Sequence, residues 1–549
     1  MYLNFIYNFY LNFFSSKKIF VTLILSWISI ITFTYFVLPP AADDMYYFWP
    51  ALNFFYENRL GMYEGENFVI TYFQFPIYSI INGYFLNIYS FFDIHISSYT
   101  YKIFNKILLL SLFLLSIIWI KNNSTNYNFY LRINTFLILI TFTPFSLGLI
   151  GSVRPEFLGI VLILLSLIIF ENARRSNFTK FLNLCSSAFF LGLAFTVHPQ
   201  FFTICSVAAL LMLLEIYFKY KNYKAIFVYV IIFCIPIICL IFWYILGYPL
   251  SLDFLLNRAN YIGESPISIA KNNFYNLIKQ SLLLTEAASF TKIYQSVFTL
   301  PYFVLLLLIF PFTVFFLKKE KFLFSQKITF FIFISSLLNF TFIKTYDYYL
   351  GVIAFFLLLF FCSLISTSIQ YKEKNKIKVD NFINVFSVLI FILNSFFLIA
   401  HTSKLLISDK KYYSISKTQN SVHPYIQEDN ILILTSDKLF GAFVSSFEKN
   451  YTENKIKTFM IFPFPDAGAT KNQMDNASSF LKTQLMNFKT ENLIFGSKKI
   501  NSDINIEKKQ IVLFIEKNLN IFINFSEIIY EDKDHIFFIP QNIKIINQT

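Results

Sequence analysis

Residues 225–246 read AIFVYVIIFCIPIICLIFWYIL, and no charged side chain interrupts them. A helix rises 1.5 Å per residue, so about 20 apolar residues cross the ~30 Å hydrocarbon core of a bilayer. Runs of similar character recur through most of the first 400 residues. We therefore predict about eleven membrane-spanning helices. Their ranges are 19–38, 103–120, 133–150, 157–170, 181–197, 200–217, 225–246, 297–317, 328–343, 350–369 and 382–400.

Composition agrees with a membrane protein and excludes two other classes. Of the 549 residues, 56% are hydrophobic and 14% are charged, whereas soluble domains carry about 25% charged residues. The net charge of +13 does not indicate a nucleic-acid-binding face, because the Lys and Arg residues stand in short clusters between apolar runs. No nucleic acid partner is therefore expected.

The basic clusters also predict the topology. They fall in every second connection, so those loops are expected on the cytoplasmic side, with the N terminus inside and the C terminus outside. The residues are Lys17, Lys18, Lys121, Arg132, Arg174, Arg175, Lys180, Lys219, Lys221, Lys224, Lys318, Lys319, Lys321, Lys327, Lys372, Lys374, Lys376 and Lys378.

Two regions divide the chain. Residues 1–400 are predicted to form the transmembrane domain, with long outer connections at 39–102 and 247–296. Beyond residue 401, charged residues become common and short β-rich runs alternate with helical patterns. The predicted fold class is thus a polytopic α-helical membrane protein with a small C-terminal extracytoplasmic α/β domain over 401–549. The expected strands lie at 431–434, 458–462, 493–495, 527–530 and 536–539.

The sequence contains no clear motif for binding a cofactor or a metal ion. All five Cys residues fall within or at the edge of apolar runs, which indicates packing and neither a disulfide framework nor a metal cluster. No Gly-rich phosphate loop follows a predicted strand. The sequence therefore requires no cofactor and assigns no metal ligand, and it leaves assistance by a divalent cation open.

An acidic pair, Asp43-Asp44, comes directly after the first predicted span, behind Pro39-Pro40. Carboxylates close to a membrane surface are costly unless they are solvated or used. One interpretation is the start of a helix, where acids favour the dipole and Pro favours the first turn. The other is a functional site, because the aromatic residues of 44–60 would hold this loop at the height of the headgroups. About 30 residues further on, Gln74 opens a second amphipathic stretch.

Two more candidates lie at predicted outer ends of spans. Arg154 and Glu156 flank Pro155, and they form either a local ion pair or a cation for a phosphate with an acid that positions it. His198 stands at the turn between the fifth and sixth spans, where it is either structural or a hydrogen-bond partner of a substrate hydroxyl or phosphate.

Lys344 precedes the tenth span together with Tyr348 and Tyr349. Lys and Tyr beside a span are ordinary interface anchors. The alternative is a phosphate contact by Lys344, with the two phenols beside it. All these candidates map to the same predicted outer face.

The order of these motifs resembles the GT-C class of membrane glycosyltransferases, which use polyprenyl-phosphate sugars. The nearest likeness is to the protein O-mannosyltransferase and lipid A aminoarabinose transferase relatives, over about residues 15–370. The segments that carry it are Asp43-Asp44, Gln74-Phe75-Pro76-Ile77, Ser152–Leu158, Gly192–Pro199 and Lys344–Tyr349. The chain departs from the class pattern in two places: His198 stands where Lys is usual, and Phe75 replaces the first residue of a paired Pro.

This resemblance implies an inverting glycosyl transfer on the outer face. Asp43 would be the general base on an acceptor hydroxyl, and Asp44 would orient the acceptor or stabilise charge. Arg154 and Lys344, with Tyr348 and Tyr349, would bind the donor phosphate. In the same scheme Glu156, His198 and Gln74 would position substrate.

The implied partners are a polyprenyl-phosphate-linked sugar, a glycan, glycolipid or protein acceptor, and the bilayer. The implied location is a bacterial inner membrane with a periplasmic active site. Two other functions remain as alternatives. A transporter or flippase of lipid-linked glycans usually has inverted repeats and polar residues at mid-bilayer, whereas these spans are nearly free of charge. An envelope glycan ligase or polymerase usually has Arg and His in a late outer loop, and 247–296 has Arg258 but no His.

Overall fold

The computed structural model describes just under half of the chain. The residues described are 11–37, 47, 50–51, 54–55, 58, 62–64, 67–69, 76–94, 98–124, 126–141, 155–247, 323–342, 350–364, 385, 388–389, 422, 431–434, 457–460, 493–498, 521–531 and 535–545. The chain divides into two compact units. Unit 1 contains Met1–Val37, Asn105–Phe242 and Glu264–Thr402, and unit 2 contains Leu38–Phe104, Trp243–Gly263 and Ser403–Thr549.

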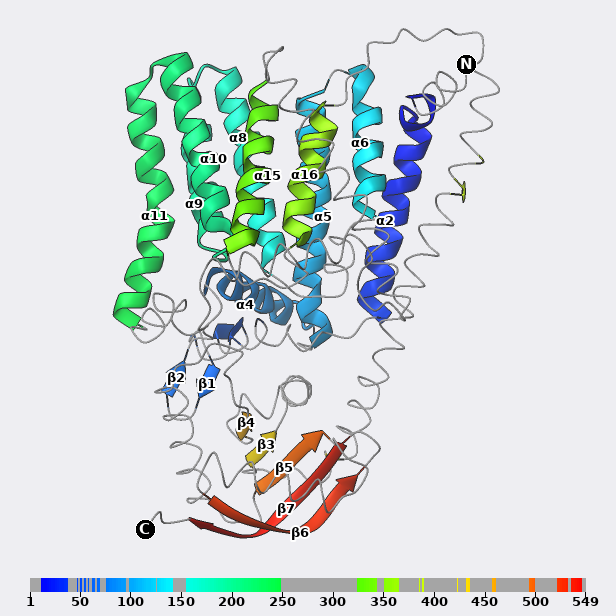
Figure 1. The fold of residues 1–549 in the computed structure, drawn as a ribbon, viewed down its shortest axis with the longest axis vertical. Helices are drawn as coiled ribbons and strands as arrows, with labels where there is room; N and C mark the ends of the chain where they lie inside the picture. The colour runs from blue at the N-terminus through cyan, green and yellow to red at the C-terminus, as the bar shows by residue number, and fades with distance from the viewer. Residues whose placement is uncertain are drawn as a thin grey trace. The chain divides into compact units, whose positions relative to one another are not determined.

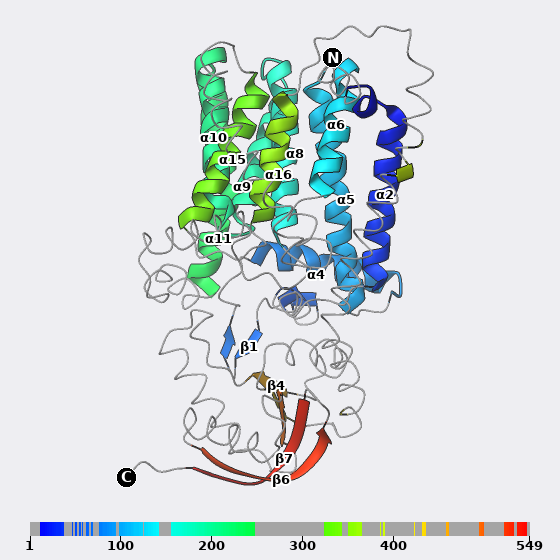
Figure 2. The same cartoon turned by 45° about the vertical axis from the view of Figure 1, so that its right-hand side comes forward.

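Unit 1 is built from helices that run side by side (Figures 1 and 2). They are α2 (Lys17–Val37), most of α5 (Ser98–Asn122), α6 (Asn126–Thr141), α8 (Glu156–Arg175), α9 (Phe181–Phe195), α10 (Phe201–Glu215), its π-helical continuation η2 (Ile216–Tyr220), most of α11 (Tyr223–Gly247), α15 (Phe324–Phe342) and α16 (Leu350–Leu364).

Four helices in the described part are long and apolar enough to cross a membrane. They cover Lys102–Asn122, Glu156–Arg175, Phe201–Tyr220 and Tyr223–Leu246. Every predicted span that falls within the described residues coincides with a helix. The predicted spans 297–317 and 382–400 lie outside the continuous described segments, so the total number of spans and their orientation stay predictions.

Several helices extend beyond the predicted spans, and α8 is the clearest case at its C-terminal end. The sequence indicated residues 157–170, whereas α8 extends to Arg175. The reason lies in its last turn, where Glu171 accepts hydrogen bonds from Arg174 Nε at 2.8 Å and from Arg175 Nε at 3.2 Å. Because the buried Glu171 pairs with both arginines, the helix continues through a segment that its charges had marked as a loop.

Helices α8 and α9 meet through polar contacts in an otherwise apolar interface. Ser166 Oγ donates to the backbone oxygen of Ser187 at 2.8 Å, and Ser187 Oγ donates to that of Ser166 at 3.0 Å. Both residues are fully buried. Small hydroxyl residues let helix backbones approach closely and satisfy their own polar groups, which suits an interface surrounded by lipid.

A glycine permits a second close approach, between α9 and α11. A Cβ atom at Gly192 would collide with the backbone oxygen of Phe233. A backbone atom cannot rotate away as a side chain can, so this position requires glycine. The residue is therefore a packing determinant of unit 1.

The substitution Gly192→Ala tests this contact. It should lower the thermal stability of the purified protein, because the overpacking cost of about 1–3 kcal/mol outweighs the ~1 kcal/mol gain in helix propensity. Ser186→Ala, on the same helix, is the matched control and should leave the melting temperature nearly unchanged. Equal melting temperatures for wild type and Gly192→Ala would contradict the close approach.

Unit 2 contains a five-stranded mixed sheet of order β4-β3-β5-β7-β6. Its strands are β3 (Ile431–Leu434), β4 (Lys457–Met460), β5 (Leu493–Lys498), β6 (Ile521–Glu531) and β7 (His535–Ile545). Strand β3 pairs in parallel with β4 and β5, whereas β7 is antiparallel to β5 and β6. All five strands overlap those predicted from the sequence; the helical patterns at 440–447 and 472–488 lie outside the described residues.

The central strands are covered on both faces. Consecutive residues Leu493–Phe495 of β5 and Ile536–Phe538 of β7 are all fully buried. Successive side chains of a strand point to opposite faces, so burial of three in a row requires cover on both. Unit 2 also contains a short hairpin, β1 (Met62–Glu64) with β2 (Asn67–Val69), and the helix α4 (Pro76–Phe91).

Candidate active site

The best-described part of the first predicted outer loop is a contact between α4 and the segment just after the acidic pair. The rings of Tyr47 and Tyr78 lie 5.7 Å apart and edge to face, and Ser79 Oγ donates to the backbone oxygen of Tyr47 at 3.5 Å. Further along, the rings of Phe54 and Tyr84 lie 5.3 Å apart. Tyr47 and Phe54 therefore both lie against α4, within unit 2.

Gly83 makes this contact close. A Cβ atom at this position would come within 2.6 Å of Phe54 Cδ1 and 3.1 Å of the Ala51 backbone oxygen. A side chain at this position would displace the Phe54 ring and crowd the Ala51 backbone oxygen. The acids Asp43 and Asp44 precede this contact in the chain by a few residues.

Asn82 comes directly before Gly83 on α4 and is fully buried. Its carboxamide has no hydrogen-bond partner within the described residues. On a helix it shares a face with Tyr78 and Phe85. Both of those rings contact Phe104 of α5, with centroid distances of 5.7 and 4.6 Å. A buried carboxamide without a partner is costly and in a folded protein calls for a specific explanation.

Two predicted site residues, Glu156 and His198, lie at the same end of unit 1. Glu156 is in the first turn of α8 and is 1% exposed, and His198 is in the turn before α10 and is 7% exposed. Gly159 lies three residues after Glu156, and Phe201 lies three residues after His198. A Cβ atom at Gly159 would collide with the ring of Phe201. The contact holds the starts of α8 and α10 together. Gln200 N–H donates to His198 Nδ1 at 3.4 Å, a local contact in the turn.

The other predicted site residues lie outside the described part of the chain: Asp43, Asp44, Gln74, Arg154, Lys344, Tyr348 and Tyr349. Their roles stay predictions. Within the described residues, no group of three or more His, Cys, Asp or Glu side chains could hold a metal ion.

Sequence reasoning did not single out Ser79, Asn82 or Gly83. Part of the signal was present, because Ser79, Asn82, Leu86 and Tyr89 recur at helical spacing, and all four are buried. That pattern marks a face of α4 as buried. It does not reveal that the partner of that helix is the segment after Asp44, since that contact joins residues about 30 positions apart.

Comparisons with known proteins bear on the fold. No protein-family model matches the chain, and no curated protein sequence matches it. Among solved structures, ArnT from Cupriavidus metallidurans bound to undecaprenyl phosphate matches with a TM-score of 0.54 at 9% identity, over 94% of this chain and 97% of that one. Its apo state matches equally well.

The chain has the fold of a GT-C glycosyltransferase. ArnT is a lipid A aminoarabinose transferase, so the resemblance stated from the sequence motifs is confirmed at the level of the fold. The Archaeoglobus fulgidus oligosaccharyltransferase tethered with an acceptor peptide also matches, with a TM-score of 0.45 at 11% identity, over 95% of this chain and 75% of that one.

The substitution Gly83→Ala tests whether the α4 contact serves the site of this GT-C fold. We expect it to reduce any glycosyl transfer that depends on the acidic pair, because misplacement of a reacting group by about 1 Å can cost about 100-fold in rate. The melting temperature should change little, since the contact involves one short segment. Asn87→Ala, at an exposed position of the same helix, is the control and should retain full activity. Unchanged turnover in Gly83→Ala would show that the contact does not position the acids.

Proposed function

We propose that this protein is an inverting glycosyltransferase that moves a sugar from a polyprenyl-phosphate donor to a hydroxyl of an envelope glycan, glycolipid or protein. The observation that carries the proposal is the GT-C fold. The match to ArnT covers 94% of this chain, and that structure was solved with undecaprenyl phosphate bound. The proposed location is the inner membrane of a bacterium, with the reaction on the periplasmic side.

In the proposed reaction, the carboxylate of Asp43 takes the proton of the acceptor hydroxyl as its oxygen attacks the anomeric carbon. The bond from that carbon to the phosphate oxygen breaks, and the polyprenyl phosphate leaves with the electron pair. Attack from the face opposite the leaving group inverts the anomeric centre. Asp44 orients the acceptor or stabilises charge.

The proposal assigns the phosphate to cations. Arg154 and Lys344 offset the negative charge that develops on the leaving phosphate, and Tyr348 and Tyr349 donate hydrogen bonds to it. Glu156, His198 and Gln74 position substrate. The placement of Glu156 and His198 supports their assigned role, because both lie at one end of unit 1, near the starts of α8 and α10.

The contact between α4 and residues 47–55 supports the role of Asp43. Tyr47 comes three positions after Asp44, and a chain of that length reaches at most about 11 Å. Docking of Tyr47 on α4 therefore limits how far the acidic pair can move. A base needs such restraint, because proton transfer depends on its distance from the hydroxyl.

The substitution Asp43→Asn tests the proposed function. It should lower the rate of transfer by about 10²- to 10⁴-fold, the usual contribution of a general base, with expression and melting temperature unchanged. Asp93→Asn, in the exposed turn after α4, is a matched control with the same chemical change and should remain active. Transfer would be followed by mass spectrometry of envelope glycans and glycolipids, compared with cells that lack the gene. A folded Asp43→Asn protein with full activity would refute the assignment.

Lys344→Ala separates the donor site from the acceptor site. Loss of a phosphate-binding cation should raise the KM for the lipid-phosphate donor and leave the KM for the acceptor nearly constant. Both constants would be measured with purified protein in mixed micelles. An equal rise in the two constants would argue against a phosphate contact by Lys344.

A further inference from the structure

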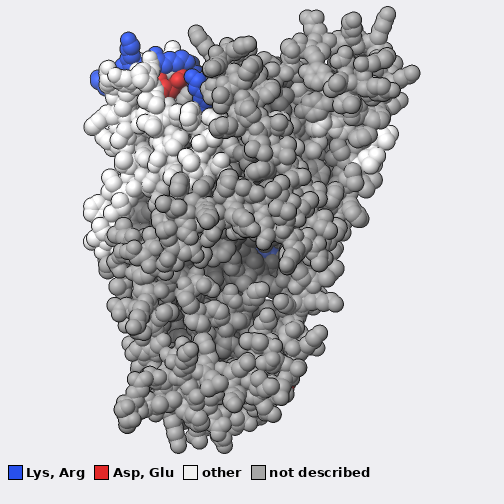
Figure 3. Space-filling model, in the orientation of Figure 1, with Lys and Arg blue, Asp and Glu red and all other residues white. Residues whose placement is uncertain are grey.

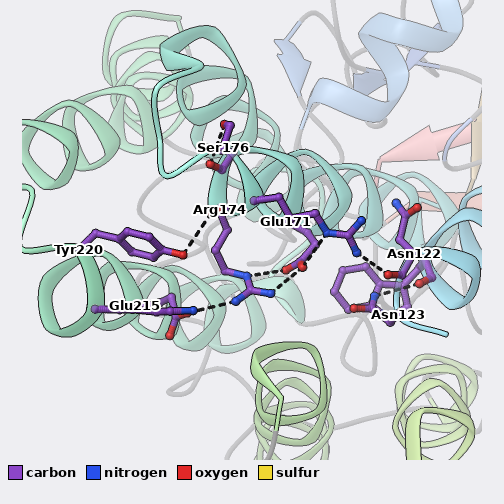
Figure 4. A network of polar contacts seen from close by, with 11 residues as sticks. Asn122, Asn123, Glu171, Arg174, Ser176, Glu215 and Tyr220 are labelled. Carbon is purple, nitrogen blue, oxygen red and sulfur yellow. Dashed lines mark hydrogen bonds and ion pairs between the residues drawn. The ribbon is translucent and has the colours of Figure 1, made fainter. Parts of the chain in front are cut away.

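A network of charged side chains closes one end of unit 1 (Figure 4). Glu171 lies near its centre, with a side chain that is 2% exposed. It accepts hydrogen bonds from Arg174 Nη2 at 2.7 Å and from Arg175 Nε at 3.2 Å. Arg174 Nη1 also lies 3.6 Å from Glu215 Oε1, which Lys219 Nζ approaches to 3.5 Å. Both carboxylates, of Glu171 and Glu215, are thus paired with cations of the network.

The network ties two loops together. These are the connection between α8 and α9, residues 176–180, and the connection between η2 and α11, residues 221–222. The rings of Phe178 and Tyr220 lie 4.7 Å apart and perpendicular, and Tyr220 O–H donates to the backbone oxygen of Arg174 at 3.2 Å. The two loops therefore form one surface, although they are about 40 residues apart in the sequence.

This surface carries an excess of positive charge. Residues 171–224 include six Lys or Arg residues and only two Glu, an excess of four. Lys180, Lys221 and Lys224, which we call the basic cluster, are exposed and form no ion pair with an acid in the described part of the chain. Figure 3 shows Lys and Arg atoms gathered at this end of unit 1, around a smaller acidic patch.

The positions of two of these lysines are unfavourable within the protein alone. Lys180 is the residue before α9, and Lys224 is in the first turn of α11, and neither helix has an acid in its first turn. A cation at the N-terminus of a helix opposes the helix dipole. An anion from outside the chain would remove this conflict.

Large apolar side chains surround the basic cluster. Phe181 and Leu182 follow Lys180 and are 53% and 77% exposed, and Phe218 and Tyr223 flank Lys221 at 70% and 66%. Cations that alternate with exposed aromatic and aliphatic side chains at the ends of apolar helices match the boundary between headgroups and acyl chains. A soluble anion would use the lysines alone, whereas a lipid would use both kinds of side chain.

We propose that the basic cluster binds the headgroup phosphate of an anionic phospholipid, whose acyl chains lie against the neighbouring exposed apolar residues. The charge of the site and its apolar margins both fit this occupant. The site is at the end of unit 1 where α8 and η2 finish and where α9 and α11 begin, at the opposite end of α8 from Glu156. It does not depend on the proposed glycosyl transfer.

The experiment compares lipid binding by the full-length protein and by variants with matched charge. Purified protein is titrated with phosphatidylglycerol or phosphatidylcholine and examined by native mass spectrometry for retained lipid. Lys221→Gln/Lys224→Gln should weaken the retention of phosphatidylglycerol by about 30-fold, in keeping with two lost cations near a lipid surface. Lys17→Gln/Lys18→Gln removes the same charge from exposed residues of α2, on the other side of unit 1 (Figure 1), and should have little effect.

Two further variants test the geometry. Lys180→Gln alone should weaken lipid binding. When it is combined with Lys221→Gln/Lys224→Gln, the further loss should be smaller than the loss from Lys180→Gln alone, because the two loops bind one headgroup. Tyr220→Phe keeps every charge and removes the hydrogen bond between the loops, so it should also weaken binding.

The opposing outcomes are distinct. Equal losses in the Lys17/Lys18 and Lys221/Lys224 variants would indicate diffuse attraction and overturn the proposal. So would equal retention of phosphatidylglycerol and phosphatidylcholine, or retention of added undecaprenyl phosphate in preference to phosphatidylglycerol. A loss confined to the basic cluster, with transferase activity in the same samples either present or absent, supports the lipid site and leaves the proposed function to be judged separately.

Discussion

The polar groups of the backbone impose the main constraint on this structure. In hydrocarbon an unsatisfied N–H or C=O group costs several kcal/mol, so the long apolar runs must close their hydrogen bonds within each helix. Several buried polar side chains of unit 1 follow the same rule. In the middle of unit 1, Ser166 and Ser187 satisfy each other across the α8–α9 interface, and elsewhere Thr135 and Ser116 donate to backbone oxygens one turn earlier in their own helices. Among the described residues, the site candidates Glu156 and His198 and the basic cluster all lie at or next to helix ends.

Close packing between helices follows from the same constraint. Without a hydrophobic driving force between helices in lipid, association depends on contact and on hydrogen bonds. A few glycine positions therefore determine how closely the helices pack. Gly159 and Gly192 admit the ring of Phe201 and the backbone of Phe233, and in unit 2 Gly83 admits the segment that follows the acidic pair. In each case a helix is fixed against a neighbour at a distance that a Cβ atom would prevent.

Much of the fold was predictable because it depends on local properties. Apolar length located the helices, and β-rich runs located all five strands of the sheet. The end of α8 was missed because Arg174 and Arg175 resemble loop residues until Glu171 is seen to bind both. Contacts such as Tyr47 with Ser79, or Phe178 with Tyr220, join distant segments, and no periodicity of a single sequence encodes them. The motifs for Asp43, Arg154 and Lys344 predict a site through their order and sidedness, whereas Glu156 and His198 are the two members whose placement is described.

Helix α8 connects the end of unit 1 that carries Glu156 and His198 with the end that carries the basic cluster. Its first turn contains Glu156 and its last turn contains Glu171, and it is fixed to α10 near both ends, by Gly159 against Phe201 and by Arg174 with Glu215. These contacts restrain α8 against the same neighbour near both of its ends. Lipid at the basic cluster would act on the depth and tilt of these helices in the bilayer, which headgroup anchors help to set. In the proposed transfer this depth matters, because a polyprenyl-phosphate donor would be held at the headgroup plane by its own lipid.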